Sequence, residues 1–201
     1  MPNRASRTAK TLRTRAPEAT RERLVAAAFQ QIHRHGYQGA GLDTILASAG
    51  VTKGALYHHF ANKKELYQAV VEDMEQELVE RLEAAGAGRA PWERLSAMCS
   101  AYVDACREPA LARMLVLEAP AVLGWKTWCN LEQRYEVAAF ARCLKEIDGL
   151  NEPAETLAQV ILGALTTGAR VIATAPDPEA ARTEVQQTID RLICGLRSTA
   201  R

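Results

Sequence analysis

The chain has 201 residues and a formal net charge of only +1, with 48% hydrophobic and 24% charged residues. This length can bury a hydrophobic core in one or two domains. No apolar run is long enough for a transmembrane helix, and the basic start lacks the apolar stretch of a secretory signal, so we expect a cytoplasmic protein without a membrane partner. The five cysteines are odd in number and form no CxxC pair, which argues against a zinc site or disulfide framework and predicts no metal or cofactor.

The small net charge hides two modules of opposite sign. Residues 1–65 contain 11 Lys and Arg against 4 Asp and Glu, a net of +7, whereas the remainder contains 14 against 20, a net of −6. A basic module beside an acidic one favours contact of the first module with a polyanion. Charge alone leaves open a merely solvated surface.

The N-terminal segment predicts an arm followed by a helix. Residues 1–17 are rich in Arg, Thr and Ala and contain no acid, which is typical of a disordered basic arm. This arm is either a solubilising tail or a DNA contact through Arg13 or Arg15. Pro17 is suited to the start of a helix, and apolar residues follow at helical spacing until Gly36, where a left-handed residue can end it.

Two short helices joined by a tight turn are expected next. Asp43 and Thr52 are suitable N-cap residues for these helices, and Gly50 lies in the turn between them. This arrangement is a helix-turn-helix. Asn62 and Glu65 then resemble a capping box that opens a longer helix.

The remaining chain contains helical segments separated by proline and glycine. We expect helices at about 91–107, 109–118 (stopped by Pro120), 121–148 (broken near Gly124), 153–174 and 178–197. No alternating strand pattern of useful length is present. The prediction is therefore an all-α fold, with an arm at 1–17, a three-helix unit containing the helix-turn-helix at 18–65, and a larger helical part at 66–201.

One stretch carries many motif residues at fixed spacing. They are Gly36-Tyr37, Ile45, Ala49-Gly50-Val51-Thr52, Gly54, Tyr57, His59-Phe60, Lys63 or Lys64, and Leu66. This set resembles the DNA-binding signature of the TetR family of transcriptional regulators. The chain departs from the family pattern in having Ala40 and Gly41 where a Thr and a Ser or Thr are usual.

The resemblance implies a ligand-responsive regulator, usually a repressor, that a small molecule releases from a pseudo-palindromic operator. It also implies a homodimer whose partner is double-stranded DNA, with a DNA-binding domain at 18–65 and an effector-binding and dimerisation domain at 66–201. A recognition helix must be slim where it enters the major groove, and Lys53 can donate there to guanine. Candidate DNA contacts are Thr44, Thr52, Lys53, Gly54, Ala55, Tyr57, His58 and Lys63. The alternative role of Tyr57 is packing, and metal binding by His58 and His59 is disfavoured because adjacent helical residues point apart.

The middle helices concentrate aromatic and sulfur-containing side chains. Such a surface favours a largely apolar pocket for a hydrophobic or aromatic effector. The candidate pocket residues are Met98, Tyr102, Met114, Glu118, Trp125 and Trp128. Apolar stripes on the last two helices predict a four-helix dimer interface formed by Leu157, Ile161, Leu165, Ile189, Leu192 and Leu196. The alternative for both sets is that they form the core of their own chain.

Two other classes of function are alternatives to a ligand-responsive regulator. An enzyme is not expected, because the sequence contains no Ser-His-Asp set, phosphate loop or metal-ligand cluster. The second alternative is a DNA-binding regulator without a small-molecule effector, controlled by a protein partner or by redox. Cys99 with Cys106, and Cys129 with Cys143, lie at helical spacing that keeps a redox sensor conceivable.

Overall fold

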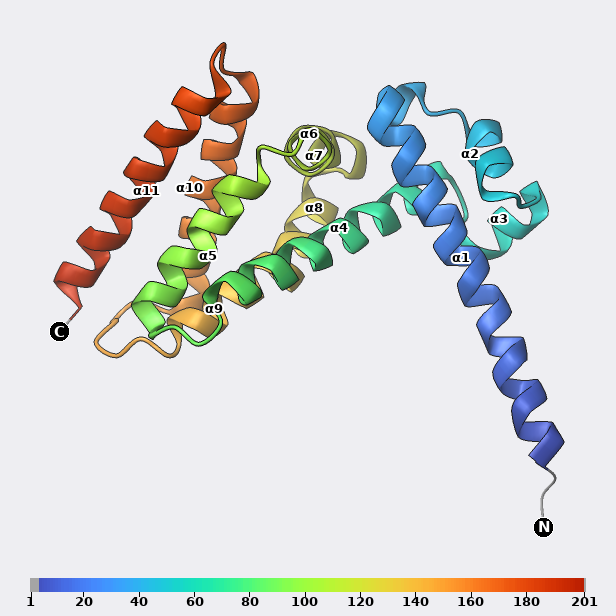
Figure 1. The fold of residues 1–201 in the computed structure, drawn as a ribbon, viewed down its shortest axis with the longest axis horizontal. Coiled ribbons are helices and arrows are strands. Elements are labelled where there is room, and N and C mark those ends of the chain that lie inside the picture. Colours follow the sequence, from blue (N-terminus) through green and yellow to red (C-terminus); the bar gives the residue numbers. More distant parts are fainter. Residues whose placement is uncertain (1–3, 201) are drawn as a thin grey trace. The chain divides into compact units, whose positions relative to one another are not determined.

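The computed structural model describes residues 4–200 and divides the chain into two compact units, residues 1–70 and 71–201. Every regular element between residues 4 and 200 is a helix, which confirms the predicted all-α class (Figure 1). The boundary lies at Val70 rather than at residue 65, within helix α4 (Lys63–Gly86).

The first helix, α1 (Arg4–Gly39), begins earlier than predicted. We expected a disordered arm up to Pro17, but the chain is helical from Arg4. The reason is that residues 4–16 contain neither Gly nor Pro and are rich in Ala, Arg, Lys and Leu, which favour helices. Residues 1–3 lie outside the described residues, as do the side chains of Arg13 and Arg15, so a DNA contact of the arm stays a prediction.

The first unit packs α1 against α2 (Leu42–Ala49) and α3 (Lys53–His59). Gly36 interrupts the helical path of α1, as predicted, with φ 71° and ψ 168°. Apolar side chains spaced three or four residues apart point inward from each helix, because that spacing keeps them on one helical face. The largest buried members of this core are Leu24, Ile32, Ile45, Leu56, Leu66 and Tyr67.

The second unit contains the rest of α4 and nine further elements. They are α5 (Pro91–Ala105), α6 (Pro109–Leu111), η1 (Ala112–Glu118), α7 (Ala119–Leu123), α8 (Trp125–Glu132), η2 (Gln133–Val137), α9 (Ala138–Leu144), α10 (Ala154–Thr174) and α11 (Pro178–Thr199). The predicted break at Gly124 is confirmed, with φ 86°.

Pro120 does not stop a helix, contrary to the prediction. The helical path continues from Pro109 to Leu123 because η1 is a π-helical turn, in which the Ala119 N–H donates to the Met114 carbonyl five residues earlier. Pro120 then lies in the first turn of α7, a position at which helices tolerate proline. Such π-helical turns occur often at functional sites, and η2 is a second one.

Helix α10 forms the centre of the second unit. It packs against α11, α9, α5 and η1, and Figure 1 shows it lying alongside α11. By length and composition α10 could span a membrane, which the sequence did not lead us to expect. Half of the apolar stretch of α10 is buried inside the chain, as in the core helix of a soluble protein.

Candidate DNA-binding and effector sites

Local signals build the helix-turn-helix. Gly50 adopts the left-handed conformation of the turn, with φ 63° and ψ 39°. The Thr52 hydroxyl caps α3 by accepting the Ala55 N–H at 3.3 Å, as predicted. The cap predicted at Asp43 is wrong, because α2 begins two residues earlier than that cap implies, with Gly41 as its N-cap and no side-chain cap. Asp43 instead places its charge in the first turn of α2, where the helix dipole favours an acid.

Helix α3 presents one polar face to solvent. Lys53, Gly54, Tyr57 and His58 are exposed and follow helical spacing, while Leu56 is fully buried and anchors the opposite face. Of the other predicted contacts in this region, Thr44 and Thr52 are exposed and Ala55 is half-buried. Tyr57 is 50% exposed, so packing alone does not account for this side chain.

No contact within its own chain requires residue 54 to be a glycine. A Cβ built there would have as its nearest neighbour Thr52 Oγ1, at 4.0 Å, which is an ordinary van der Waals distance. Glycine weakens a helix relative to alanine. A bare backbone at this exposed position is suited to close approach by a partner outside the chain.

Lys63 is already engaged within the first unit. Its ammonium donates to the Tyr37 carbonyl and lies 4.5 Å from the centroid of the Tyr37 ring. Burial lowers the pKa of Lys63. This contact fastens the segment after Gly36 to the start of α4. Lys64, next in the chain, is exposed.

The start of α4 and the histidine pair also follow their sequence signals. The Glu65 N–H donates to Asn62 Oδ1 at 2.9 Å, so Asn62 caps α4 as predicted. Glu65 Oε2 accepts from the N–H of Ala61 at 2.8 Å, one residue before the cap, rather than from the Asn62 N–H that a capping box would use. His59 is half-buried and lies against Phe60, with ring centroids 6.4 Å apart, which agrees with a packing role. Among the residues described here, no group of three His, Cys, Asp or Glu could hold a metal ion.

The second unit contains a cavity of about 310 Å³ at the junction of η1, α7, α8, η2 and α10. Two of the predicted effector residues, Trp125 and Trp128, line this cavity. Trp128 is buried, whereas Trp125 is 73% exposed. Polar groups on the wall include Glu132, Thr166 and Arg170.

The other predicted effector residues lie elsewhere. Met98, Tyr102 and Met114 are buried and do not line this cavity, although the Tyr102 hydroxyl lies 3.5 Å from Oγ1 of Thr166, which does. Glu118 forms an ion pair with Arg113 at 2.9 Å. The structure therefore brings the two tryptophans together and places the two methionines in the core.

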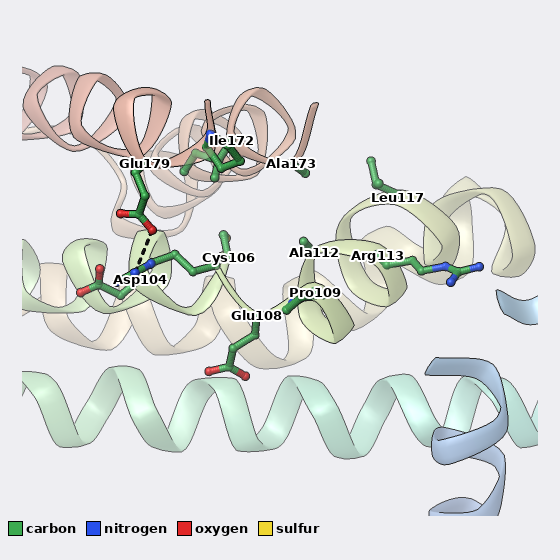
Figure 2. A pocket seen from close by; sticks show the side chains of 12 residues that line it. Asp104, Cys106, Glu108, Pro109, Ala112, Arg113, Leu117, Ile172, Ala173 and Glu179 are labelled. Carbon is green, nitrogen blue, oxygen red and sulfur yellow. Dashed lines mark ion pairs between the residues drawn. The ribbon is translucent and has the colours of Figure 1, made fainter. Parts of the chain in front are cut away.

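A larger groove of about 900 Å³ lies between the end of α5, η1, and the facing ends of α10 and α11 (Figure 2). Cys106, Ala112 and Ile172 contribute buried apolar surface to it. Its rim is exposed and charged, with an ion pair between Arg107 and Glu179 at 2.8 Å. Sequence reasoning did not predict this groove, because its walls come from segments far apart in the chain.

Two buried acids were also missed. Glu75 on α4 and Glu136 in η2 are 0% and 2% exposed, and their carboxyl groups lie close enough to interact with each other. Burial raises the pKa of Glu75 to about 7 and raises the pKa of Glu136 well above its usual range. A signal was available for Glu75, since it shares the inward stripe of α4 with Val71, Leu78 and Leu82.

The buried cysteines are poorly suited to redox sensing. Burial raises the pKa of Cys99 and of Cys106 to about 12, and that of Cys143 to about 11. The thiolate is the reactive form, and a high pKa makes it scarce at neutral pH. Cys194 on α11 is exposed.

The predicted dimer stripe is largely internal. Leu157, Ile161, Leu165 and Ile189 are buried within their own chain, so they are not available to a second copy as predicted. Leu192 is 53% exposed and Leu196 is half-buried. The apolar surface left open on α10 consists instead of Val160, 65% exposed, and Val171, 49% exposed.

The helix-turn-helix of the first unit and the all-helical second unit define the class of helix-turn-helix transcriptional regulators. The chain matches the family model of bacterial regulatory proteins of the tetR family over residues 24–70. It also matches the model "Tetracyclin repressor-like, C-terminal domain" over residues 92–196, more than half of the chain. The chain belongs to the TetR family of transcriptional regulators.

Named relatives agree with this family. The chain is 32% identical to a TetR-family transcriptional regulator from Pectobacterium atrosepticum of known structure, with a TM-score of 0.77 over 90% of this chain and 95% of that one. It is 43% identical over 58 residues to the transcriptional repressor SCO4008 of Streptomyces coelicolor, covering 29% of this chain and 30% of the relative. It is 34% identical over 99 residues to the transcriptional activator FasR of Mycolicibacterium smegmatis, covering 49% and 45%. The chain thus spans less than half the length of either curated relative.

These relatives are transcriptional regulators rather than enzymes. Regulators of the TetR family bind DNA operators, form dimers and bind small-molecule effectors.

Proposed function

We propose that this protein is a cytoplasmic, homodimeric transcriptional repressor that a small, largely apolar molecule releases from a pseudo-palindromic operator. The observation that carries the proposal is the exposed face of α3, on which Lys53, Tyr57 and His58 surround a glycine that its own chain does not require. No catalytic activity is part of this function.

On DNA, α3 enters the major groove. Lys53 donates to guanine, and Gly54 and Ala55 let the backbone approach the base edges. Tyr57, His58 and the Thr44 hydroxyl bind phosphate, and Thr52 combines its capping role with a contact to DNA. Because Lys63 is held by Tyr37, exposed Lys64 supplies the phosphate contact at the start of α4.

Two copies pair through the outer faces of α10 and α11. Val160 and Val171 lie exposed on α10, and Leu192 lies exposed on α11. Two such helices from each copy form a four-helix interface around a two-fold axis. A two-fold dimer matches an operator whose half-sites are about 34–36 Å apart, one turn of DNA.

The effector occupies the cavity beside Trp125 and Trp128. Its volume of about 310 Å³ suits a small ligand, and its wall combines aromatic surface with a few polar groups. Helix α4 includes residues of both units, so a change in its second half reaches the DNA-binding unit through a continuous helix. The effector then favours the conformer that binds the operator less well, and its differential affinity for the two conformers supplies the coupling.

The test is fluorescence anisotropy with DNA from upstream of the protein's own gene, followed by genome-wide fragment selection if that site fails. We expect a preferred pseudo-palindrome that binds one dimer with an affinity that falls as salt rises. Lys53→Ala should weaken binding about tenfold or more, since a good base contact is worth about 1–3 kcal/mol. Tyr57→Ala should weaken it through a lost phosphate contact.

Lys126→Ala is the matched control, because it removes one exposed positive charge from the second unit. Its binding should equal that of the wild-type protein. The proposal fails if no fragment is preferred over random DNA at any salt concentration, or if Lys53→Ala and Lys126→Ala bind the selected site equally well.

A further inference from the structure

The second unit buries more negative charge than it neutralises. Glu75 and Glu136 are 0% and 2% exposed, and their carboxyl groups lie close enough to interact with each other. Both carboxyl oxygens of Glu75 and Oε2 of Glu136 are buried without a hydrogen-bond partner. Among the side chains that the structure describes, neither carboxyl forms an ion pair with a basic side chain.

A third acid connects this pair to the cavity. Glu132 lines the cavity, accepts a hydrogen bond from the Trp128 side chain, and repels both Glu75 and Glu136 electrostatically. Arg170 is the one basic group on the described cavity wall, and it acts on Glu132 while donating to Thr167 at 3.2 Å. Glu132 is therefore the one carboxyl group on the described wall of this tryptophan-lined cavity, and it interacts with the buried Glu75 and Glu136, which do not line the cavity themselves.

Uncompensated buried carboxylates are costly, and a protein avoids that cost by keeping them protonated or by supplying a cation. Burial raises the pKa of Glu75 and of Glu136, which favours their protonated forms. Glu136 also interacts with Tyr102 of α5 and with Cys106, the residue after α5, and neither of these carries a positive charge. Arg170 acts on Glu132 but not on Glu75 or Glu136, so among the described side chains the buried pair lacks a cation.

We propose that the effector is a small aromatic cation, a protonated aryl-alkyl amine, whose ring packs on Trp125 and Trp128 and whose ammonium is bound by Glu132 and the Glu75–Glu136 pair. The tryptophan faces attract the positive charge as well as the ring. When the ammonium binds, a proton held by the Glu75–Glu136 pair passes to the buffer. This inference rests on the proposed function, since it names the ligand class of the same cavity.

The cluster of these three carboxyl groups also places the ligand's charge on the helix that enters both units. Glu75 lies on α4 only five residues after Val70, the last residue of the first unit. An ammonium that draws Glu75 toward Glu132 therefore acts directly on α4. Loss of that contact should leave ligand and operator binding uncoupled.

The test uses the full chain and two ligands of nearly identical shape, 1-naphthylmethylamine and the neutral 1-naphthylmethanol. Isothermal titration calorimetry at pH 7.5 should show the amine binding at least tenfold more tightly than the alcohol. Repeating the titration in buffers of different ionisation enthalpy should reveal release of protons on amine binding. Glu132→Gln and Glu136→Gln should each weaken amine binding at least tenfold and leave alcohol binding unchanged.

Glu152→Gln, an exposed acid outside the cluster, is the matched control and should bind both ligands as the wild type does. Thermal melts confirm that each variant is folded. Equal binding of amine and alcohol, no binding of the amine at millimolar concentration, or undiminished amine binding by both cluster variants would each overturn the inference. Operator binding without any amine is measured in parallel, so a protein that binds its operator but ignores the amine refutes the ligand class and leaves the proposed function intact.

Discussion

Replacing Gly54 with alanine should stabilise the protein and weaken its binding to DNA. The structure gives the first half of this expectation. A Cβ at this position meets nothing closer than Thr52 Oγ1, at 4.0 Å, so it fits without strain. Glycine in a helix costs about 0.5–1 kcal/mol relative to alanine, and we expect the free energy of unfolding to rise by a similar amount.

The second half follows from the neighbours of Gly54 on α3. Lys53 and Tyr57 are exposed on the face that we assign to the major groove, and the added methyl group would project among them. If that methyl group holds the helix back enough to lose one base contact, binding falls by about 1–3 kcal/mol, which is about tenfold or more. Urea denaturation and operator titration by anisotropy measure the two effects on the same preparation.

Asn130→Ala provides the matched control. Asn130 is exposed on α8 in the second unit, and alanine there also improves helix propensity. This variant should gain stability without any change in operator affinity. The reasoning is refuted if Gly54→Ala becomes more stable and still binds the operator as tightly as the wild-type protein, since no close approach of DNA would then explain the glycine.

Three further changes have definite expected outcomes. Gly168→Ala should destabilise the packing of α10 on α11, because its Cβ would lie 2.6 Å from Cγ1 of stiff Val185, and an overpacking cost of about 1–3 kcal/mol exceeds the gain in helix propensity. Adding Val185→Ala should recover stability in urea denaturation, and a Gly168→Ala protein as stable as wild type would contradict the close approach. Glu75→Gln should flatten the pH dependence of stability. The folded protein retains a proton on Glu75 that the unfolded chain releases, so the wild type loses stability as pH rises from about 4.5 through about 7. Urea titrations between pH 5 and pH 8 measure this slope, and equal slopes for both proteins would exclude Glu75 as its source. Leu192→Glu should raise the dimer dissociation constant at least tenfold in sedimentation velocity, whereas a dimer that withstands both Leu192→Glu and Val160→Glu must pair through another surface.

The parts of the fold that depend on neighbours in sequence were predicted well. The turn at Gly50 depends only on the backbone conformation of that residue. The Thr52 cap needs only the N–H of Ala55, and the Asn62 cap needs only the N–H of Glu65, in each case three positions later. The start of α2 was placed wrongly because Asp43 looks like a cap, whereas the helix begins after Gly41, which has no side chain that could cap it. Local rules recover local structure, and they fail where a helix begins without a capping side chain.

The candidate effector site was harder to predict because its polar groups come from distant segments. Glu75 and Glu136 lie on different helices 61 positions apart, and only tertiary packing brings them together. A buried acid also contradicts the usual rule that charged residues mark the exposed face of a helix. The aromatic content of α8 did indicate the cavity, since both Trp125 and Trp128 line it.

The error at the dimer interface has a different origin, namely that α10 has two apolar stripes. Leu157, Ile161, Leu165 and Ile172 form one stripe and are buried within the chain. The second stripe contains Val160, Gly163, Thr167 and Val171, all exposed and spaced by three or four residues. Both stripes have the same helical period, so periodicity alone cannot say which faces the core. An exposed stripe of valine and small residues lets another helix approach closely, which makes it, rather than the leucine stripe, the surface that we expect a second copy to cover.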